Sequence, residues 1–341
     1  MKHYNIPIFI NHVGCPNSCV FCSQQKINGV ETDITPDEVK EIIDEYLVYL
    51  PENAQIEVAF FGGTYTGISF ELQRKYLKIV KPYIDSGRVQ GIRLSTRPDC
   101  IDDKILSQLK ENGVKVIELG VQSLDQKVLD LTERNYPVSA VEEAVNKIKA
   151  YGIQIGIQLM IGLPGSDCYK DYHTAEKALE MKPDMIRIYP SLVLKGTEME
   201  NMYREGRYFP LTLESAIEIT KKIYALFIVN DVNIIRVGLQ PSDDLREEGV
   251  IVAGPFHPAF RELVEGEIYY DFFKEILEKE ENLEIICNEK NRSKIIGNKG
   301  KNRDRLHGKL NLKIESRIDE NRISINGKIY TKNEIFRRGI K

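Results

Sequence analysis

Short apolar runs alternate with amphipathic helical patterns along most of the chain. Strand-like runs occupy residues 6–10, 56–61, 91–96, 116–123, 153–162 and 185–193, and a seventh follows at 232–238. The first helix is predicted over 36–50, because Thr35, Pro36 and Glu38 form a capping box with proline at the first helical position. The chain has six successive strand–helix units, and their strands are too apolar to expose one face to solvent. This pattern predicts a parallel sheet covered by helices.

The predicted fold class is α/β, a partial (β/α)6 barrel of the TIM type followed by a small α+β domain. The barrel is expected over residues 1–240, and residues 241–283 are expected to form a helical connector with a loop near the barrel mouth. Residues 284–341 form the predicted C-terminal domain. In such barrels the chemistry lies at the carboxyl ends of the strands. Polar and glycine-rich segments do follow these ends, as in GGTYTG, STRPD, QS, GLPG and YPS.

Composition predicts a folded protein of the cytoplasm. The chain has 341 residues, of which 42% are apolar, and no run approaches the roughly 18 apolar residues of a membrane-spanning helix. The N-terminus lacks the pattern of a secretory signal. The net charge of −4 is unevenly distributed, since residues 288–341 carry 16 Lys and Arg against 6 Asp and Glu, which leaves −14 on residues 1–287. A basic module therefore follows an acidic one, and this favours a polyanionic partner.

Three cysteines, Cys15, Cys19 and Cys22, lie within eight residues of each other directly after the first strand. The other three cysteines are isolated, so a disulfide framework is not expected. A structural zinc site would be the plainer interpretation, but such a site normally has a fourth Cys or His in a second local pair. No second pair exists, and three thiolates without a fourth favour a [4Fe–4S] cluster with one iron open to substrate.

The motif Cys15-x-x-x-Cys19-Val20-Phe21-Cys22 resembles the signature of radical S-adenosylmethionine enzymes. FFGGT resembles the glycine-rich segment that follows the second strand in this family. ELGVQS, GLPG and IRIYPSLVLKGT resemble the subgroup that contains the Elongator catalytic subunit and oxygen-independent coproporphyrinogen III oxidase. The resemblance covers roughly residues 5–240. It implies that the three cysteines hold the cluster, that S-adenosylmethionine binds the fourth iron, and that one-electron reduction releases a 5′-deoxyadenosyl radical. An external donor such as flavodoxin or ferredoxin would supply the electron.

The resemblance also implies which residues contact the cofactor. Gly62 and Gly63 would let the backbone approach its methionine end, where Thr64 replaces an acidic residue that is often found. Arg97 and Ser95 would face the carboxylate, unless Arg97 only pairs with Asp99 or with a carboxylate of a helix. The remaining expected contacts lie at the aromatic position of the motif and at later strand ends, namely Phe21, Gln122, Ser123, Gln158 and Tyr189. No catalytic side chain is identified.

Two departures bear on the substrate. The coproporphyrinogen oxidase pattern has a further cysteine two positions after the third, where this chain has Gln24. Porphyrin chemistry is therefore disfavoured. The Elongator subunit spaces its cysteines differently and continues into an acetyltransferase domain, whereas about a hundred residues follow residue 240 here. Acetyl transfer is consequently not expected.

The C-terminal segment IIGNKG resembles the glycine loop of KH domains, which bind single-stranded nucleic acid. The expected RNA contacts are Gly297, Asn298, Lys299, Gly300, Lys301 and Arg303. The alternative is a packing domain in which the two glycines only form a tight turn between helices.

Together these features predict a radical S-adenosylmethionine enzyme that modifies a nucleoside in tRNA or rRNA. Two alternatives stay open: an enzyme acting on a small metabolite, and a non-catalytic iron–sulfur regulator that binds RNA.

Overall fold

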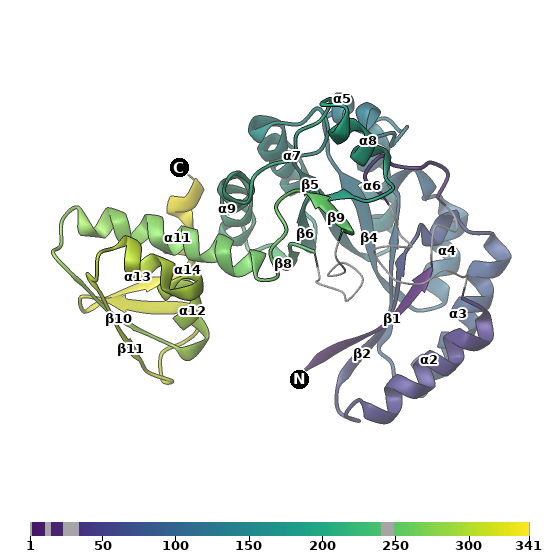
Figure 1. Ribbon diagram of the computed structural model, residues 1–341. Coiled ribbons are helices and arrows are strands. Elements are labelled where there is room, and N and C mark those ends of the chain that lie inside the picture. The colour runs from purple at the N-terminus through teal and green to yellow at the C-terminus, as the bar shows by residue number, and fades with distance from the viewer. Residues whose placement is uncertain (1, 11–14, 23–33, 240–248, 341) are drawn as a thin grey trace.

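The computed structural model describes residues 2–10, 15–22, 34–239 and 249–340, and its largest element is a sheet of seven parallel strands. The strand order follows the chain, so each strand pairs with the next one in the sheet (Figure 1). This is the predicted partial barrel of alternating strands and helices. The strands are β1 (His3–Ile10), β2 (Gln55–Gly62), β3 (Gly91–Thr96), β4 (Val114–Gln122), β5 (Gln154–Ile161), β6 (Met185–Pro190) and β8 (Asn233–Val237).

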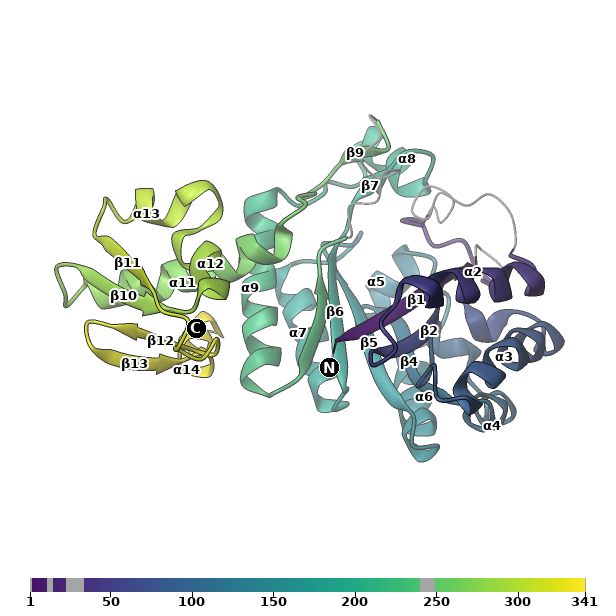
Figure 2. The same ribbon diagram turned by 90° about the horizontal axis from the view of Figure 1, so that it is seen from below.

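Helices cover the outer face of this sheet (Figure 2), and the first of them begins at the polar cap that the sequence predicts. Thr35 and Glu38 form the expected capping box at the start of α2, and Thr212 accepts a hydrogen bond from the backbone of Ser215 at the start of α9. The helices are α2 (Pro36–Tyr49), α3 (Phe70–Asp85), α4 (Asp103–Glu111), α5 (Gln126–Leu131), α6 (Ser139–Ala150), α7 (Cys168–Glu180), α8 (Glu198–Arg204) and α9 (Leu213–Val229).

The two faces of the sheet differ in polarity because successive strand residues point in opposite directions. In β3, Ile92 and Leu94 are buried in the main hydrophobic core, whereas Arg93 lies on the opposite, inner face. There the Arg93 guanidinium contacts the carboxylates of Glu57 and Glu118, and Arg187 on β6 pairs with the same Glu118. We call these four residues the ion-pair belt, since they connect β2, β3, β4 and β6 across the inner face.

The belt crosses β5 at a glycine. A Cβ atom at Gly156 would lie 3.0 Å from Cγ of Glu118 and 3.1 Å from Cγ of Met185. The absence of a side chain at this position therefore lets Glu118 reach Arg187 across the intervening strand.

The C-terminal part forms a separate four-stranded sheet, joined to the barrel through α11 (Phe260–Leu277). β10 is central, parallel to β11 and antiparallel to β12. The helix α11 contacts both α9 and the short helices of the C-terminal part, so it holds the two parts together. The elements are β10 (Leu283–Cys287), α12 (Arg292–Ile296), α13 (Lys301–Arg305), β11 (Leu310–Ile314), β12 (Arg322–Ile325), β13 (Lys328–Thr331) and α14 (Lys332–Phe336).

Two buried side chains on or against α11 make this junction. Glu265 is 1% exposed and accepts hydrogen bonds from Tyr224, Arg261 and Lys294. Asn302 is 2% exposed and donates to the Gly266 carbonyl at 2.8 Å. Because buried polar groups are costly without partners, these contacts fix the C-terminal part against the barrel.

None of the helices in the described ranges combines the length and apolar character needed to cross a lipid bilayer.

Candidate functional site

The cysteine loop lies at the carboxyl ends of the strands, where the sequence places it. The Cys15 Sγ is 3.0 Å from the Thr64 Oγ1, in the loop that follows β2. The Val20 backbone accepts a hydrogen bond from Met199 at 2.8 Å and donates one to Thr132 at 3.3 Å. These contacts hold the loop against segments from three parts of the chain.

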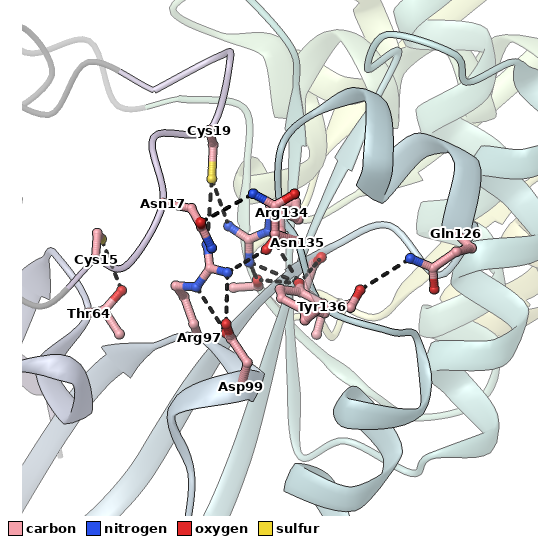
Figure 3. A network of polar contacts seen from close by, with 12 residues as sticks. Cys15, Asn17, Cys19, Thr64, Arg97, Asp99, Gln126, Arg134, Asn135 and Tyr136 are labelled. Atoms are coloured by element: carbon pink, nitrogen blue, oxygen red, sulfur yellow. Dashed lines mark hydrogen bonds and ion pairs between the residues drawn. The ribbon is translucent and has the colours of Figure 1, made fainter.

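Two arginines converge on Cys19 (Figure 3). The Arg134 guanidinium lies 3.4 Å from the Cys19 Sγ, and the Arg97 guanidinium lies 3.7 Å from it. Arg97 also makes a two-point ion pair with Asp99, at 2.9 Å for each nitrogen, and donates to the Arg134 carbonyl at 2.5 Å. The second cysteine is therefore surrounded by positive charge.

Arg134 comes from a segment that sequence reasoning did not single out, the turn at 132–136 between α5 and α6. Glu133 and Asn135, on either side of it, both have left-handed backbone, with φ of 55° and 54°. This conformation is uncommon for residues other than glycine and marks a constrained turn. The Asn135 amide donates to the Asn17 side chain at 3.2 Å, so the turn also supports the cysteine loop. An arginine in a short interhelical turn has no periodic pattern that would reveal it.

Arg134 is a buried cation that lacks a carboxylate partner within the described part of the chain. It is 5% exposed, and its partners are the Tyr136 hydroxyl, the Gly120 carbonyl and Cys19. An uncompensated buried charge is costly, so a site of this kind fits an anionic group. Three thiols that are close in sequence, beside a guanidinium with no carboxylate partner in the described chain, have the chemistry that suits an iron–sulfur cluster with an anionic ligand.

The thiols do not form a metal-binding group on their own. No set of three His, Cys, Asp or Glu side chains lies close enough to hold a metal ion, as far as the described residues go. Cys100 lies in the Arg97 loop but is a poor additional ligand, because burial, and then Asp99, raise the pKa of its thiol to about 11. The predicted alternative for Arg97, pairing with Asp99, is present in the structure.

Two of the predicted cofactor residues meet at the ends of adjacent strands. The Gln158 amide on β5 donates to the Gln122 side-chain oxygen at 3.3 Å. Gln122 is 5% exposed, and its φ of 68° accompanies an irregularity in the pairing of β4 with β5. Gly62 ends β2 with φ of 98°, a left-handed conformation that glycine adopts without strain. The neighbouring Gly63 is half-buried.

The other predicted cofactor residues have local contacts. Ser123 accepts a hydrogen bond from the Asp125 backbone at 3.1 Å, and the Tyr189 hydroxyl accepts one from Arg187 at 3.2 Å. Ser95 is half-buried on β3. Phe21 packs against a small second core that includes Val20 and residues from α8 and β9 (Ile251–Ala253). Gln24, on which the argument against porphyrin chemistry depends, lies outside the described residues.

The glycine loop of the C-terminal part has both a packing role and a free basic surface. A Cβ atom at Gly297 would lie 2.8 Å from the Asn302 backbone nitrogen, so this glycine lets Asn302 insert between the loop and α11. The cations around the loop are exposed, and none of them forms a salt bridge within the described ranges. They are Lys299, Lys301 and Arg303.

Comparison with known proteins gives matches over most of the chain. The model of the Radical SAM superfamily matches residues 12–168, and the Radical_SAM C-terminal domain matches residues 183–270. A tRNA uridine(34) acetyltransferase from Methanocaldococcus jannaschii is 31% identical over 185 residues, which are 48% of this chain and 34% of that protein. Elongator complex protein 3 of Bos taurus is 32% identical over 254 residues, which are 62% of this chain and 46% of that protein.

Among solved structures, an N-terminally truncated Elp3 from Methanocaldococcus infernus has the same fold, with a TM-score of 0.60 and 23% identity over 83% of this chain and 70% of that one. The chain spans less than half the length of the two named relatives. The two family matches together cover more than half of this chain. The chain therefore belongs to the radical SAM superfamily of enzymes, in which its relatives include Elongator complex protein 3 and tRNA uridine(34) acetyltransferases.

Proposed function

We propose that this protein reductively cleaves S-adenosylmethionine at a [4Fe–4S] cluster held by Cys15, Cys19 and Cys22, and that it modifies a nucleoside in tRNA or rRNA. The observation that carries the proposal is the pairing of this cysteine loop with the buried Arg134, which has no carboxylate partner within the described chain. When bound, the cluster and S-adenosylmethionine would supply a 5′-deoxyadenosyl radical that abstracts hydrogen from the substrate.

Arg134 is the best candidate for binding the cofactor carboxylate. The Arg97 guanidinium is already neutralised by Asp99, whereas the Arg134 guanidinium contacts only neutral oxygens and the Cys19 sulfur. A carboxylate beside Arg134 would compensate its charge. We therefore assign this role to Arg134, and we assign to Arg97 the support of Cys19 and of the Arg134 backbone.

The remaining cofactor contacts follow from the strand ends. Gly62 and Gly63 would leave the backbone accessible to the methionine amino group. Gln122 and Gln158 meet at 3.3 Å and together offer amide donors and acceptors, which suit the two ribose hydroxyls. The protein's part is to position these groups and to exclude water from the radical.

Support for an RNA substrate comes from two sources. Relatives that match this chain are named for tRNA modification at uridine 34. In addition, the exposed cations Lys299, Lys301 and Arg303 surround the glycine loop of the basic C-terminal part, which is suited to phosphate contacts. Because the matches span only part of these relatives, the acetyl transfer in their names is not part of the proposal.

The test begins with protein reconstituted with iron and sulfide without air. With dithionite it should convert S-adenosylmethionine to 5′-deoxyadenosine, and Cys19→Ala should abolish this conversion. Cys168→Ala is the matched control, because Cys168 is an exposed thiol at the start of α7. Undiminished 5′-deoxyadenosine release by Cys19→Ala would refute the cluster assignment.

Arg134→Met should weaken binding of S-adenosylmethionine about tenfold to a hundredfold, since a charge-assisted hydrogen bond contributes roughly 1.5–3 kcal/mol. Equilibrium dialysis with labelled cofactor measures this loss. The matched control is Arg88→Met, because Arg88 donates to the Leu47, Leu50 and Pro51 carbonyls away from the cysteines.

The RNA substrate is tested separately. Nucleoside mass spectrometry should detect one modification that is missing from tRNA or rRNA of cells lacking the gene. An identical set of nucleosides in the two RNA pools would refute the RNA substrate while leaving the cofactor chemistry intact.

A further inference from the structure

A basic groove lies between α3 and α4 on the helix-covered side of the barrel. Its volume is about 480 Å³. The residues that line it and matter here are Phe70, Arg74, Lys78, Lys104, Gln108 and Glu111. Both helices begin at the loops that reach the cysteines, because α3 follows the Thr64 loop and α4 follows the Arg97 loop.

The charges of the groove are available to a partner. Lys78 and Lys104 are exposed, and neither has an acidic partner in the described part of the chain. The Lys104 ammonium lies 4.4 Å from the centre of the Phe70 ring. This contact keeps the ammonium at the end of the groove where α3 and α4 begin. Arg74 has only an exposed contact with Glu71, at 3.4 Å. Since residues 1–287 carry a net charge of −14, this is a local basic surface on an acidic domain.

A continuous path of hydrogen bonds and covalent bonds connects the floor of the groove to the cysteine loop. Buried Gln108 donates to the Gln73 side-chain oxygen at 3.4 Å, and Gln73 donates to the Thr66 carbonyl at 3.2 Å. Thr66 is two residues from Thr64, whose hydroxyl is 3.0 Å from the Cys15 sulfur. The groove is thus the surface end of a packed, hydrogen-bonded connection to the proposed cluster.

The position of the groove favours a protein partner over RNA. The helices α3 and α4 lie at the opposite end of the molecule from the basic C-terminal part (Figures 1 and 2). They also cover the outer side of the sheet, whereas the predicted substrate side is the inner face and the strand ends. A partner bound in the groove would leave the inner face open.

We infer that the groove between α3 and α4 is the docking site of an acidic one-electron donor protein of the flavodoxin or ferredoxin class. This inference rests on the proposed function, because only a cluster on the three cysteines needs such a partner. In the step itself the reduced donor is oxidised by one electron and the cluster is reduced by one, and no bond is made or broken. The lysines steer the acidic donor to the groove, and the Gln108–Gln73–Thr66 path connects it with the Cys15 side of the cluster.

The test uses the reconstituted full-length protein and reduced flavodoxin, without air and at low salt. Stopped-flow absorbance follows reduction of the cluster. Lys78→Glu combined with Lys104→Glu should lower the second-order rate constant at least about tenfold, because charge complementarity acts mainly on association. The rate for the unchanged protein should fall as salt rises, and the rate for the double variant should depend on salt much less. Lys274→Glu, which alters an exposed lysine of α11, is the matched control and should react like the unchanged protein.

Reduction by dithionite separates a docking defect from a folding or cluster defect. The double variant should bind the same amount of iron and should be reduced by dithionite at the unchanged rate. An unchanged rate with flavodoxin would overturn the inference. Loss of affinity for bulk tRNA together with normal reduction by flavodoxin would assign the groove to RNA, and would overturn it as well. Failure of the unchanged protein to assemble a cluster would refute the proposed function itself.

Discussion

Removing the carboxylate of Glu118 should destabilise the barrel more than removing any exposed carboxylate. Glu118 is 4% exposed and accepts hydrogen bonds from Arg93 at 2.9 Å and from Arg187 at 3.0 Å. In Glu118→Gln the neutral amide cannot compensate two guanidinium groups. Arg93 keeps its ion pair with Glu57, but within the described chain Arg187 is left with the Tyr189 hydroxyl and the Phe61 ring beside its charge, and with no carboxylate.

The expected cost follows from that one uncompensated charge. Breaking a buried ion pair from one side costs roughly 3–5 kcal/mol, and the lower value applies here because Arg93 stays paired. For a chain of this size, about 3 kcal/mol corresponds to a fall in Tm of roughly 4 °C. Thermal unfolding followed by circular dichroism measures it. The control Glu41→Gln alters an exposed carboxylate of α2 and should change stability by less than about 0.5 kcal/mol.

A second variant tests whether the unpaired charge causes the loss. Glu118→Gln combined with Arg187→Met removes both the carboxylate and the guanidinium that depends on it. This double variant should be more stable than Glu118→Gln alone, since replacing both partners of a buried pair by groups without charge is often near neutral. If Glu118→Gln lost less than about 1 kcal/mol, or if the double variant were the less stable of the two, the reasoning would be refuted.

Three further outcomes are expected. Burial raises the pKa of Asp171 to about 6, so the folded state binds the proton more tightly than the unfolded state does. Stability should therefore fall as pH rises from about 4 to about 6. Asp171→Asn should flatten this part of a Tm-versus-pH curve. Asn302→Ala should cost about 1–3 kcal/mol in urea unfolding, because the buried Gly266 carbonyl loses its donor, whereas an unchanged midpoint would contradict this role. Glu265→Gln should lower the free energy of unfolding by at least as much, because Lys294 and Arg261 would then face a neutral amide at the junction. The same urea unfolding curves test this.

The order of the barrel strands and the start of the first helix could be predicted from local patterns. The seven runs from 6–10 to 232–238 correspond to the seven strands of the parallel sheet, and the capping box at Thr35 and Glu38 is formed as expected. Both depend on interactions between neighbours in sequence, namely periodic burial and side-chain capping of free backbone groups. The cysteine motif is also local, since its three thiols lie on one short loop.

The partners of the site residues could not be predicted in this way. Arg97 was expected at the cofactor carboxylate, and its pairing with Asp99 was only the alternative, because sequence proximity does not show where a guanidinium points. Arg134 was missed altogether, since its place beside Cys19 depends on how the turn after α5 folds back on the cysteine loop.

Local sequence thus determined where the barrel strands and the first helix form, and that three thiols follow the first strand, because these features arise from contacts within a few residues. Tertiary structure decided which charges meet. Arg93 and Arg187 are 25 and 69 positions from Glu118, and Arg187 reaches it because Gly156 on the intervening strand β5 has no side chain. The same holds for Arg134 and Cys19, 115 positions apart: the pairing of buried charges is set by the folded sheet and its loops, and by no pattern along the chain.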